Sequence, residues 1–199
     1  EHDPAGELRV LARTRRRTHL RLEELDRIRW ISGELTTPES FSDQLKGADT
    51  VIHAAALVSY RKSDAEAIQR SNVIGTRNLM GAALAAGCRD FIFISSISAI
   101  EFRPPQITDE TMMPTDMERK RLNDAYGYSK VVSELELKEI SGKMRVIILN
   151  PGVILGPGSK DIEKAAKTVR SLPVMPMLPY VNSFVDVRDV ARAVVLALS

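Results

Sequence analysis

The chain has 199 residues and 44% of them are apolar, enough for one domain with a sizeable core or for a domain and part of a second. Its 28 basic and 26 acidic residues nearly balance, so nothing in the charge favours a nucleic acid partner. One cysteine, Cys88, excludes an intrachain disulfide and fits a reducing, cytoplasmic location, and the apolar runs are too short for a membrane span, so no membrane partner is expected.

Short apolar runs alternate with longer amphipathic segments along the chain. In chain order, the pattern predicts a strand at 8–12, a strand at 28–35, a helix at 38–47, a strand at 49–56, a helix at 63–87, a strand at 90–100, a helix at 126–142, a strand at 144–150 and a helix at 186–198. Glycines 47, 87 and 142 close the first three helices, and Asp186 caps the start of the last. Residues 103–118 and most of 151–183 are predicted loops, with one helix near 161–171.

The strands are apolar throughout and are separated by helices, which is typical of an α/β fold with a parallel sheet covered on both faces. Such sheets bind ligands at the carboxyl ends of their strands. The first candidates for a site are therefore the residues that follow each strand: Arg13, Glu34, His53–Ala56, Ser95–Ser98 and Asn150–Gly152.

The stretch "NDAYGYSK" (123–130) places Tyr126 and Lys130 four positions apart. On a helix they would share one face, where an ammonium near a phenol lowers the pKa of the phenol. A tyrosine of that kind can exchange a proton with an alcohol or a carbonyl. Tyr128 lies two positions from Lys130 and would point to another face. The alternative is a tyrosine and a lysine that only share a solvated helix face.

Two other strand ends carry suggestive residues. The serines of "FISSIS" could donate a hydrogen bond to a substrate oxygen, although serines commonly end strands. The alanines of "VIHAAA" would let a flat ligand approach the backbone, or would serve close packing of a helix on the sheet. We expect His53 to be a structural histidine.

Seven blocks in order resemble the extended short-chain dehydrogenase/reductases, the NAD(P)-dependent epimerase/dehydratase family. They are "SGELTTPESF", "GADTVIHAAA", "NVIGTRNLMGAAL", "FIFISSISAI", "YGYSK", "ILNPGVILGPG" and "FVDVRDVARAV", and they extend from about residue 8 to 199. "SSISAI", "NPGVILGPG" and "FVDVRDVA" are most similar to the dihydroflavonol-reductase-like and 3β-hydroxysteroid-dehydrogenase-like branch. Ile100 and Asn150 stand where sugar-nucleotide epimerases usually have a tyrosine and an arginine.

The resemblance implies a Rossmann-like doubly wound parallel sheet with part of a small substrate lobe. Residues 1–150 would form the dinucleotide-binding domain, 151–183 a loop-rich partial lobe, and 184–199 a strand and helix that return to the first domain. The first strand of the family, its glycine-rich turn and its first helix are not found, since Gly6 is the only glycine before Gly33. Either the chain is part of a longer enzyme, which we favour, or the protein lacks a dinucleotide site. We expect the 199-residue polypeptide alone to bind NADP(H) poorly.

The resemblance also assigns roles to residues. Tyr126 would be the catalytic acid/base, Lys130 would tune it and contact the nicotinamide ribose, and Ser96, or else Ser98, would bind the reacting oxygen. Asn72 and Thr76 belong to a family motif but are expected to be structural. The implied cofactor-binding set is Glu34, Leu35, Ala54, Ala55, Ala56, Ser95, Tyr126, Lys130, Asn150, Pro151, Gly152 and Val153, and no metal is expected.

The cofactor type can be argued from the residues after the first strand. Arg13 and Arg16 lie in a run of arginines without an acidic residue, and guanidinium groups suit the 2′-phosphate of NADP(H). We therefore favour NADP(H), with NAD(H) possible and a solvated basic turn as the alternative explanation. Glu34 stands where the family usually has an aspartate near the adenine, and its side chain is longer by one methylene.

The function implied is hydride transfer between nicotinamide and a secondary alcohol or ketone. The alternatives are a nucleotide-sugar epimerase or dehydratase, and a non-catalytic cofactor-sensing protein. The partner would be a small-molecule substrate, which Val58 and Ser98 are candidates to contact. The apolar, proline-rich segment 171–182 could line a substrate pocket or pack between lobes. Relatives suggest a homodimer through the helices predicted at 63–87 and 126–142.

Overall fold

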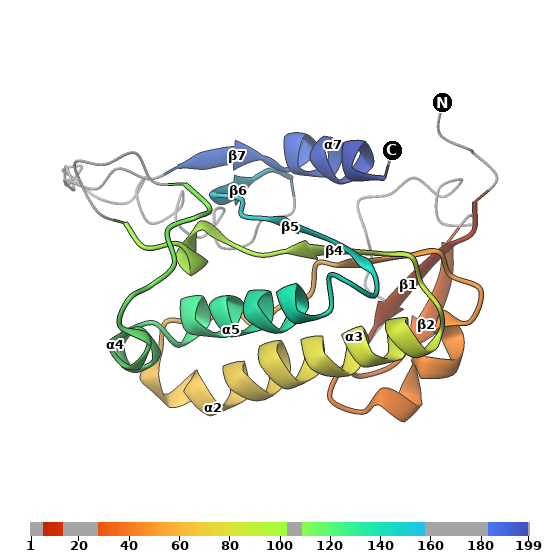
Figure 1. Ribbon diagram of the computed structural model, residues 1–199, viewed down its shortest axis with the longest axis horizontal. Coiled ribbons are helices and arrows are strands. Elements are labelled where there is room, and N and C mark those ends of the chain that lie inside the picture. The colour runs from red at the N-terminus through yellow and green to blue at the C-terminus, as the bar shows by residue number, and fades with distance from the viewer. Residues whose placement is uncertain (1–5, 14–27, 103–108, 158–182, 199) are drawn as a thin grey trace. The chain divides into compact units, whose positions relative to one another are not determined.

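The computed structural model describes residues 6–13, 28–102, 109–157 and 183–198 (Figure 1). Contacts divide the chain into two units, Glu1–Asn150 and Pro151–Ser199. The predicted helix near 161–171 and the segment 171–182 lie outside the described residues.

Parallel strands form the framework of the first unit. β1 (Leu8–Ala12) pairs with β2 (Ile28–Ser32). β4 (Asp90–Ile94) lies between β3 (Thr50–His53) and β5 (Arg145–Leu149) in a second parallel sheet. The predicted parallel α/β architecture is therefore confirmed.

Three strands end at least three residues earlier than the sequence pattern indicated. β2 stops at Ser32, β3 at His53 and β4 at Ile94, whereas the predicted strands continued to residues 35, 56 and 100. The chain leaves the ladder at these points: Ser96 caps a 3₁₀ turn (Ile97–Ala99) by accepting a hydrogen bond from the Ser98 N–H. In each case apolar residues continue along the sequence beyond the last residue that pairs with a neighbouring strand, so the apolar pattern alone placed the strand ends too late.

The helix predicted at 63–87 is interrupted by a wider turn. A 3₁₀ turn (Lys62–Asp64) leads into α2 (Ala65–Ile68), a π-helical segment (Gln69–Ile74) and α3 (Gly75–Ala85). π-helical segments occur often at functional sites. Gly87 follows α3 in the left-handed conformation, with φ +76°, as expected for a helix-closing glycine.

The other helices differ from the predictions in detail. The helix predicted at 38–47 consists of two 3₁₀ helices, Pro38–Ser40 and Ser42–Leu45, separated by the buried Phe41. The predicted loop 103–118 ends in α4 (Met117–Asn123), which Asp116 caps. α5 (Ala125–Glu139) begins one residue earlier than predicted and ends three residues earlier. Gly142 lacks a positive φ and is not its left-handed cap.

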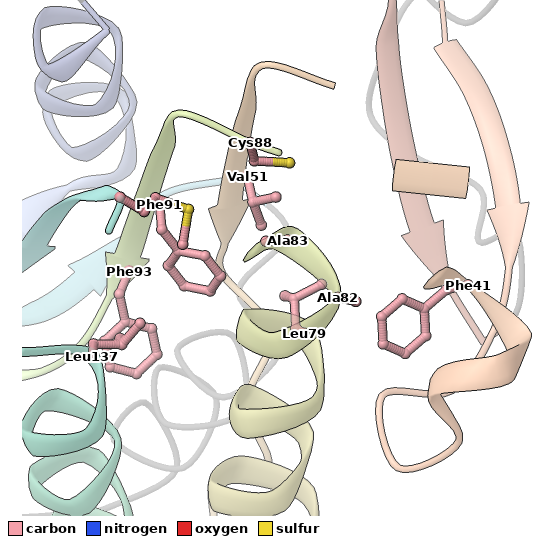
Figure 2. Packing of buried hydrophobic residues seen from close by; sticks show 10 residues of the cluster. Phe41, Val51, Leu79, Ala82, Ala83, Cys88, Phe91, Phe93 and Leu137 are labelled. Carbon is pink, nitrogen blue, oxygen red and sulfur yellow. The ribbon is translucent and has the colours of Figure 1, made fainter. Parts of the chain in front are cut away.

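Helices cover one face of the β3–β4–β5 sheet. Figure 1 shows α3 and α5 side by side along that face, and the two helices contact each other. The buried core fills the space between them and β4, with Phe91 and Phe93 pointing from the strand toward the helices (Figure 2). Phe41 packs from the other side of α3, near Leu79 and Ala82. The central strand is buried as a parallel strand should be.

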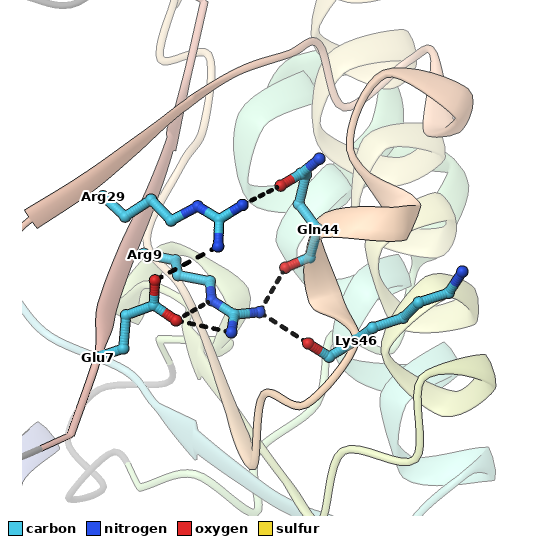
Figure 3. A network of polar contacts seen from close by, with 5 residues as sticks. All are labelled: Glu7, Arg9, Arg29, Gln44 and Lys46. Carbon is cyan, nitrogen blue, oxygen red and sulfur yellow. Dashed lines mark hydrogen bonds and ion pairs between the residues drawn. The ribbon is translucent and has the colours of Figure 1, made fainter.

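A polar network lies near the amino ends of β1 and β2, away from the carboxyl ends of the strands (Figure 3). Arg9 on β1 donates to the carbonyl oxygens of Gln44 and Lys46, each at 2.8 Å. Arg29 on β2 donates to the Gln44 side chain at 3.1 Å, and Glu7 joins the two arginines. These contacts fix the 3₁₀ segment against the strand pair and have a structural role.

The second unit contains a small parallel pair and a helix. β6 (Val153–Leu155) pairs with β7 (Phe184–Asp186), and α7 (Val187–Ala197) follows. β6 falls in the predicted loop 151–183 and was missed. Asp186 caps α7 by accepting a hydrogen bond from the Arg188 N–H at 2.8 Å, as predicted. Among the described residues, no helix is both long and apolar enough to cross a bilayer.

Candidate active site

A pocket of about 470 Å³ opens at the carboxyl ends of β1, β2 and β3. Its lining includes the predicted cofactor residues Arg13, Glu34, Leu35, Ala54, Ala55 and Ala56. Residues 54–57 are exposed, and three of them are alanines, so a ligand can reach their backbone. The structure thus brings together the part of the predicted cofactor set that follows the first three strands. Arg16 lies outside the described residues.

Opposite charges face each other in this pocket. The Arg13 guanidinium lies 3.7 Å from the Glu34 carboxylate, and both side chains are largely exposed. An exposed pair of this kind contributes little to stability, so either group is free to turn toward a ligand. The sequence pattern pointed to Arg13 as a cation without a nearby acid, and the fold places an acid beside it.

Asn72, which we expected to be only structural, holds the loop after β3. Its side-chain oxygen accepts from the Leu57 N–H at 2.7 Å, and its amide donates to the Leu57 carbonyl at 3.0 Å. The same amide donates to the Ser129 hydroxyl of α5 at 3.0 Å. Asn72 therefore binds the loop backbone much as a neighbouring strand would, and it does so from the π-helical segment.

The loop after β2 is held in a similar way. Asn78 of α3 donates to the Leu35 carbonyl at 2.9 Å. A Cβ at Gly75 would lie 3.0 Å from the Leu35 Cβ, so the glycine permits this close approach. The family-like block at residues 72–84 thus shapes two walls of the pocket, which its sequence alone did not indicate.

His53 is not a proton carrier at neutral pH. It is 2% exposed, and its Nε2 lies 2.9 Å from the Thr76 hydroxyl. Burial, together with the nearby Lys130 charge, lowers the pKa of His53 to about 3. The expectation that His53 is structural agrees with these contacts.

Tyr126 and Ser96 meet at the start of α5. Asp124 caps this helix by accepting from the Gly127 N–H at 2.8 Å, which fixes its first turn. A Cβ at Gly127 would lie 2.5 Å from the Ser98 carbonyl oxygen, so only glycine lets the helix approach the serine loop this closely. The Ser96 hydroxyl accepts from the Ser98 N–H at 3.1 Å and lies near enough to the Tyr126 phenol to lower its pKa, whereas the neighbouring Ser95 hydroxyl donates to Glu134.

The pKa of Tyr126 moves in the direction opposite to the one expected from sequence. Burial raises the pKa of Tyr126, and the nearby Ser96 hydroxyl offsets part of that rise. The expectation that Lys130 lowers the pKa considered only the four-residue spacing. In the fold, the Lys130 ammonium lies 5.9 Å from the centre of the Tyr126 ring, and burial dominates. The phenol is therefore protonated at neutral pH.

Lys130 is buried among strand and ring atoms. It is 2% exposed, donates to the Ile94 carbonyl at 2.7 Å and lies 4.5 Å from the centre of the Phe93 ring. Burial lowers the pKa of Lys130 to about 8, with the Glu134 charge acting in the opposite direction. The side chain thus remains mostly cationic at pH 7.

Glu134 was not predicted to belong to the site, yet its carboxylate lies between the carboxyl ends of β4 and β5. It is 4% exposed, and its carboxylate accepts from the Ser95 hydroxyl and, at 2.7 Å, from the Asn150 amide. Its position one helical turn after Lys130 was the available signal. The side chains of Ser95 and Asn150, both predicted to bind cofactor, instead donate hydrogen bonds to this carboxylate.

A second cavity of about 470 Å³ lies beside the start of α5, between Ser59–Lys62 and Arg121–Ala125. Tyr60 lines it and is 82% exposed. Val58 is 53% exposed and does not line this cavity. Pro151, Gly152 and Val153 belong to the second unit, where a Cβ at Gly152 would lie 2.3 Å from the Ser183 carbonyl oxygen.

Comparison with known proteins identifies the family. The sequence profile of the NAD dependent epimerase/dehydratase family matches residues 4–199. The chain therefore belongs to the NAD-dependent epimerase/dehydratase family, as its sequence blocks indicated. The Rossmann-like fold is also shared with a solved dTDP-glucose 4,6-dehydratase from Streptomyces venezuelae with NAD bound, at a TM-score of 0.79 and 23% identity, over 98% of this chain and 63% of that one.

Curated relatives include reductases. A candidate dihydroflavonol 4-reductase of Synechocystis sp. is 32% identical over 176 residues, which are 85% of this chain and 50% of that protein. Cinnamoyl-CoA reductase 1 of Petunia hybrida is 29% identical over 188 residues, 86% of this chain and 54% of that protein. The chain thus spans about half the length of these relatives.

Proposed function

We propose that the protein is an NAD(P)-dependent oxidoreductase in which Tyr126 exchanges a proton with a secondary alcohol or a carbonyl. The observation that carries this proposal is the meeting of Ser96, Tyr126 and Lys130 at the carboxyl ends of β4 and β5. Ser96 lies 30 residues before Tyr126 in the sequence, whereas Tyr126 and Lys130 share α5, and the convergence of the serine with this pair at the ligand-binding edge of a parallel sheet is not explained by packing alone.

The residues of the first pocket fit a dinucleotide. The exposed backbone of Ala54–Ala56 suits a flat ring, and the charged pair of Arg13 and Glu34 suits a phosphate or a ribose. A nicotinamide, when bound, supplies or accepts the hydride.

The chain's own residues carry the proton. Because the pKa of Tyr126 is raised, its phenol is ready to donate a proton to a carbonyl oxygen at neutral pH, which favours the reductive direction. The Ser96 hydroxyl binds the same oxygen as charge develops on it. The Lys130 ammonium stabilises the tyrosinate left after the transfer, since it lies on the same helix face one turn away.

We propose NADP(H) as the preferred cofactor. Arg13 lines the pocket at the end of β1 and is 75% exposed, so its fork can reach a 2′-phosphate. The neighbouring Glu34 carboxylate would repel the 2′-phosphate unless the Arg13 guanidinium lies between the carboxylate and the phosphate. Arg13→Gln should lower kcat/KM for NADPH by about tenfold and leave that for NADH unchanged, because one charge-assisted contact is worth about 1.4 kcal/mol or more. The matched control is Arg89→Gln. Arg89 forms a solvent-exposed ion pair with Asp49 at the amino end of β4, the end opposite to the site.

The test is net cofactor consumption by the complete protein. NADPH is supplied with a panel of aldehydes and ketones, and separately with a nucleotide sugar. The proposal predicts that NADPH is oxidised in step with alcohol formation. Isomerisation of the nucleotide sugar without net consumption would establish the epimerase alternative instead, and NADPH binding without any turnover would favour a cofactor-sensing protein.

We further propose a cytoplasmic homodimer that uses the helices at 63–87 and 126–142. Ile74 and Leu135, one on each helix, are 42% and 43% exposed, and apolar side chains on helix faces are common at subunit interfaces. The buried free thiol of Cys88 suits a reducing compartment. Light scattering of the parent and of an Ile74→Lys, Leu135→Lys variant tests the dimer: the variant should be monomeric.

A further inference from the structure

A buried carboxylate lies one helical turn after Lys130. Glu134 is 4% exposed, and a carboxylate taken out of water is costly unless hydrogen bonds and a nearby cation compensate. The turnover proposed above uses Ser96, Tyr126 and Lys130 and gives Glu134 no part. Its burial therefore calls for an explanation within the site.

The contacts of Glu134 join three elements. Ser95 follows β4 and Asn150 follows β5. The Glu134 Oε1 atom accepts hydrogen bonds from the Ser95 hydroxyl and, at 2.7 Å, from the Asn150 Nδ2. The same Asn150 amide donates to the Ser96 carbonyl at 3.2 Å. One carboxylate on α5 thus ties down both strand ends at the edge where Ser96 meets Tyr126.

The charge of Glu134 also bears on Lys130. Lys130 is contacted by Tyr126 on its own helix, by the Phe93 ring and by the Ile94 carbonyl of β4. Across the sheet it acts on His53 of β3, which is neutral near pH 7 because burial lowers its pKa to about 3. Glu134 is the group whose charge favours the ammonium form of Lys130 against the effect of burial.

We propose that Glu134 is a positioning residue for the reaction proposed above: its carboxylate joins α5 to the ends of β4 and β5, thereby sets Ser96 against Tyr126, and places a negative charge one helical turn from Lys130. The proposal rests on the oxidoreductase function of the same site. It separates two contributions, the reach of the side chain and its negative charge, and each can be removed without the other.

The first variant, Glu134→Gln, keeps the shape and an acceptor oxygen but loses the charge. Without the anion, the pKa of Lys130 falls further, so in the reductive direction the alkaline limb of the kcat–pH profile should move to lower pH. The second variant, Glu134→Asp, keeps the charge but is shorter by one methylene. Its kcat at pH 7 should fall by about 10- to 100-fold, because small misplacements at a reacting centre are costly, with the alkaline limb unmoved.

Glu139→Gln is the matched control, since Glu139 is an exposed carboxylate on the same helix. It should keep the parent kcat and pH profile. Asn150→Ala removes the partner of the same hydrogen bond and repeats the positioning test should a Glu134 variant fail to fold. Its kcat should fall as in Glu134→Asp, and a variant with both Glu134→Asp and Asn150→Ala should lose no more than the larger of the two single losses.

The proposal is overturned if the Glu134 variants fold and match Glu139→Gln in both kcat and pH profile, or if Asn150→Ala has parent kinetics. A parent protein that turns over no carbonyl substrate would instead refute the proposed function. The two failures are distinguishable, because only the second appears in the unmodified protein.

Discussion

Replacing Lys130 by methionine removes a cation that the folded protein holds against the effect of burial. Burial lowers the pKa of Lys130 from 10.5 to about 8, so the folded state binds this proton less tightly than the unfolded chain does. The resulting penalty on stability is complete below pH 8 and disappears as the pH rises past 10.5. Methionine has a similar length and carries no charge.

The magnitude follows from the shift. At about 1.4 kcal/mol per pKa unit, the lysine destabilises the fold by about 3 kcal/mol at pH 7 and by about 1 kcal/mol at pH 10. The variant also loses the hydrogen bond to the Ile94 carbonyl, which costs about 1–3 kcal/mol at either pH. The free energy of unfolding of the variant, relative to the parent, should therefore fall by about 2 kcal/mol between pH 7 and pH 10.

Urea unfolding of parent and variant at both pH values, followed by circular dichroism, measures this difference. Groups that the two proteins share cancel in the comparison, so their own titrations do not interfere. A difference between parent and variant that stays the same at pH 7 and pH 10 would refute a buried, destabilising ammonium. Catalytic turnover should be lost in the variant at every pH.

Two other substitutions probe how the site is held. Gly127→Ala places a Cβ 2.5 Å from the Ser98 carbonyl oxygen, so the free energy of unfolding should drop by about 1–3 kcal/mol, with a matching loss of kcat. Gly81→Ala is the control: it adds a Cβ in open space on α3 and should stabilise the fold by up to about 1 kcal/mol. Unchanged unfolding of Gly127→Ala would contradict the close approach. Asn72→Ala leaves the Leu57 backbone groups without their partner, so the KM for NADPH should rise with a stability loss of about 1–3 kcal/mol; an unaltered KM would show that the loop does not contact the cofactor.

The sequence was informative where local spacing and apolar runs decide the outcome. The strands, the four-residue interval between Tyr126 and Lys130, and the small residues after β3 together indicated a parallel sheet with a site at its carboxyl edge. The ends of the strands and the π-helical segment depend on partners elsewhere in the fold, and these were not predicted.

Electrostatics was the other part that spacing could not supply. The pKa of Tyr126 depends on how deeply the ring is buried, and the neutrality of His53 on its enclosure between β3 and α3. Glu134 looks like an ordinary helical acid in the sequence, because glutamate is common on solvated faces. Only the packing of α5 against β4 and β5 turns it inward to Ser95 and Asn150.

The central claim is that Tyr126 carries the proton in a cofactor-dependent reaction. Its most direct test is the kcat of a Tyr126→Phe variant of the complete protein with NADPH and a carbonyl substrate that the parent reduces. The account predicts a fall of about 100-fold or more, with NADPH affinity unchanged, because the phenylalanine ring fills the same space and lacks only the hydroxyl. Full turnover by the variant would contradict it.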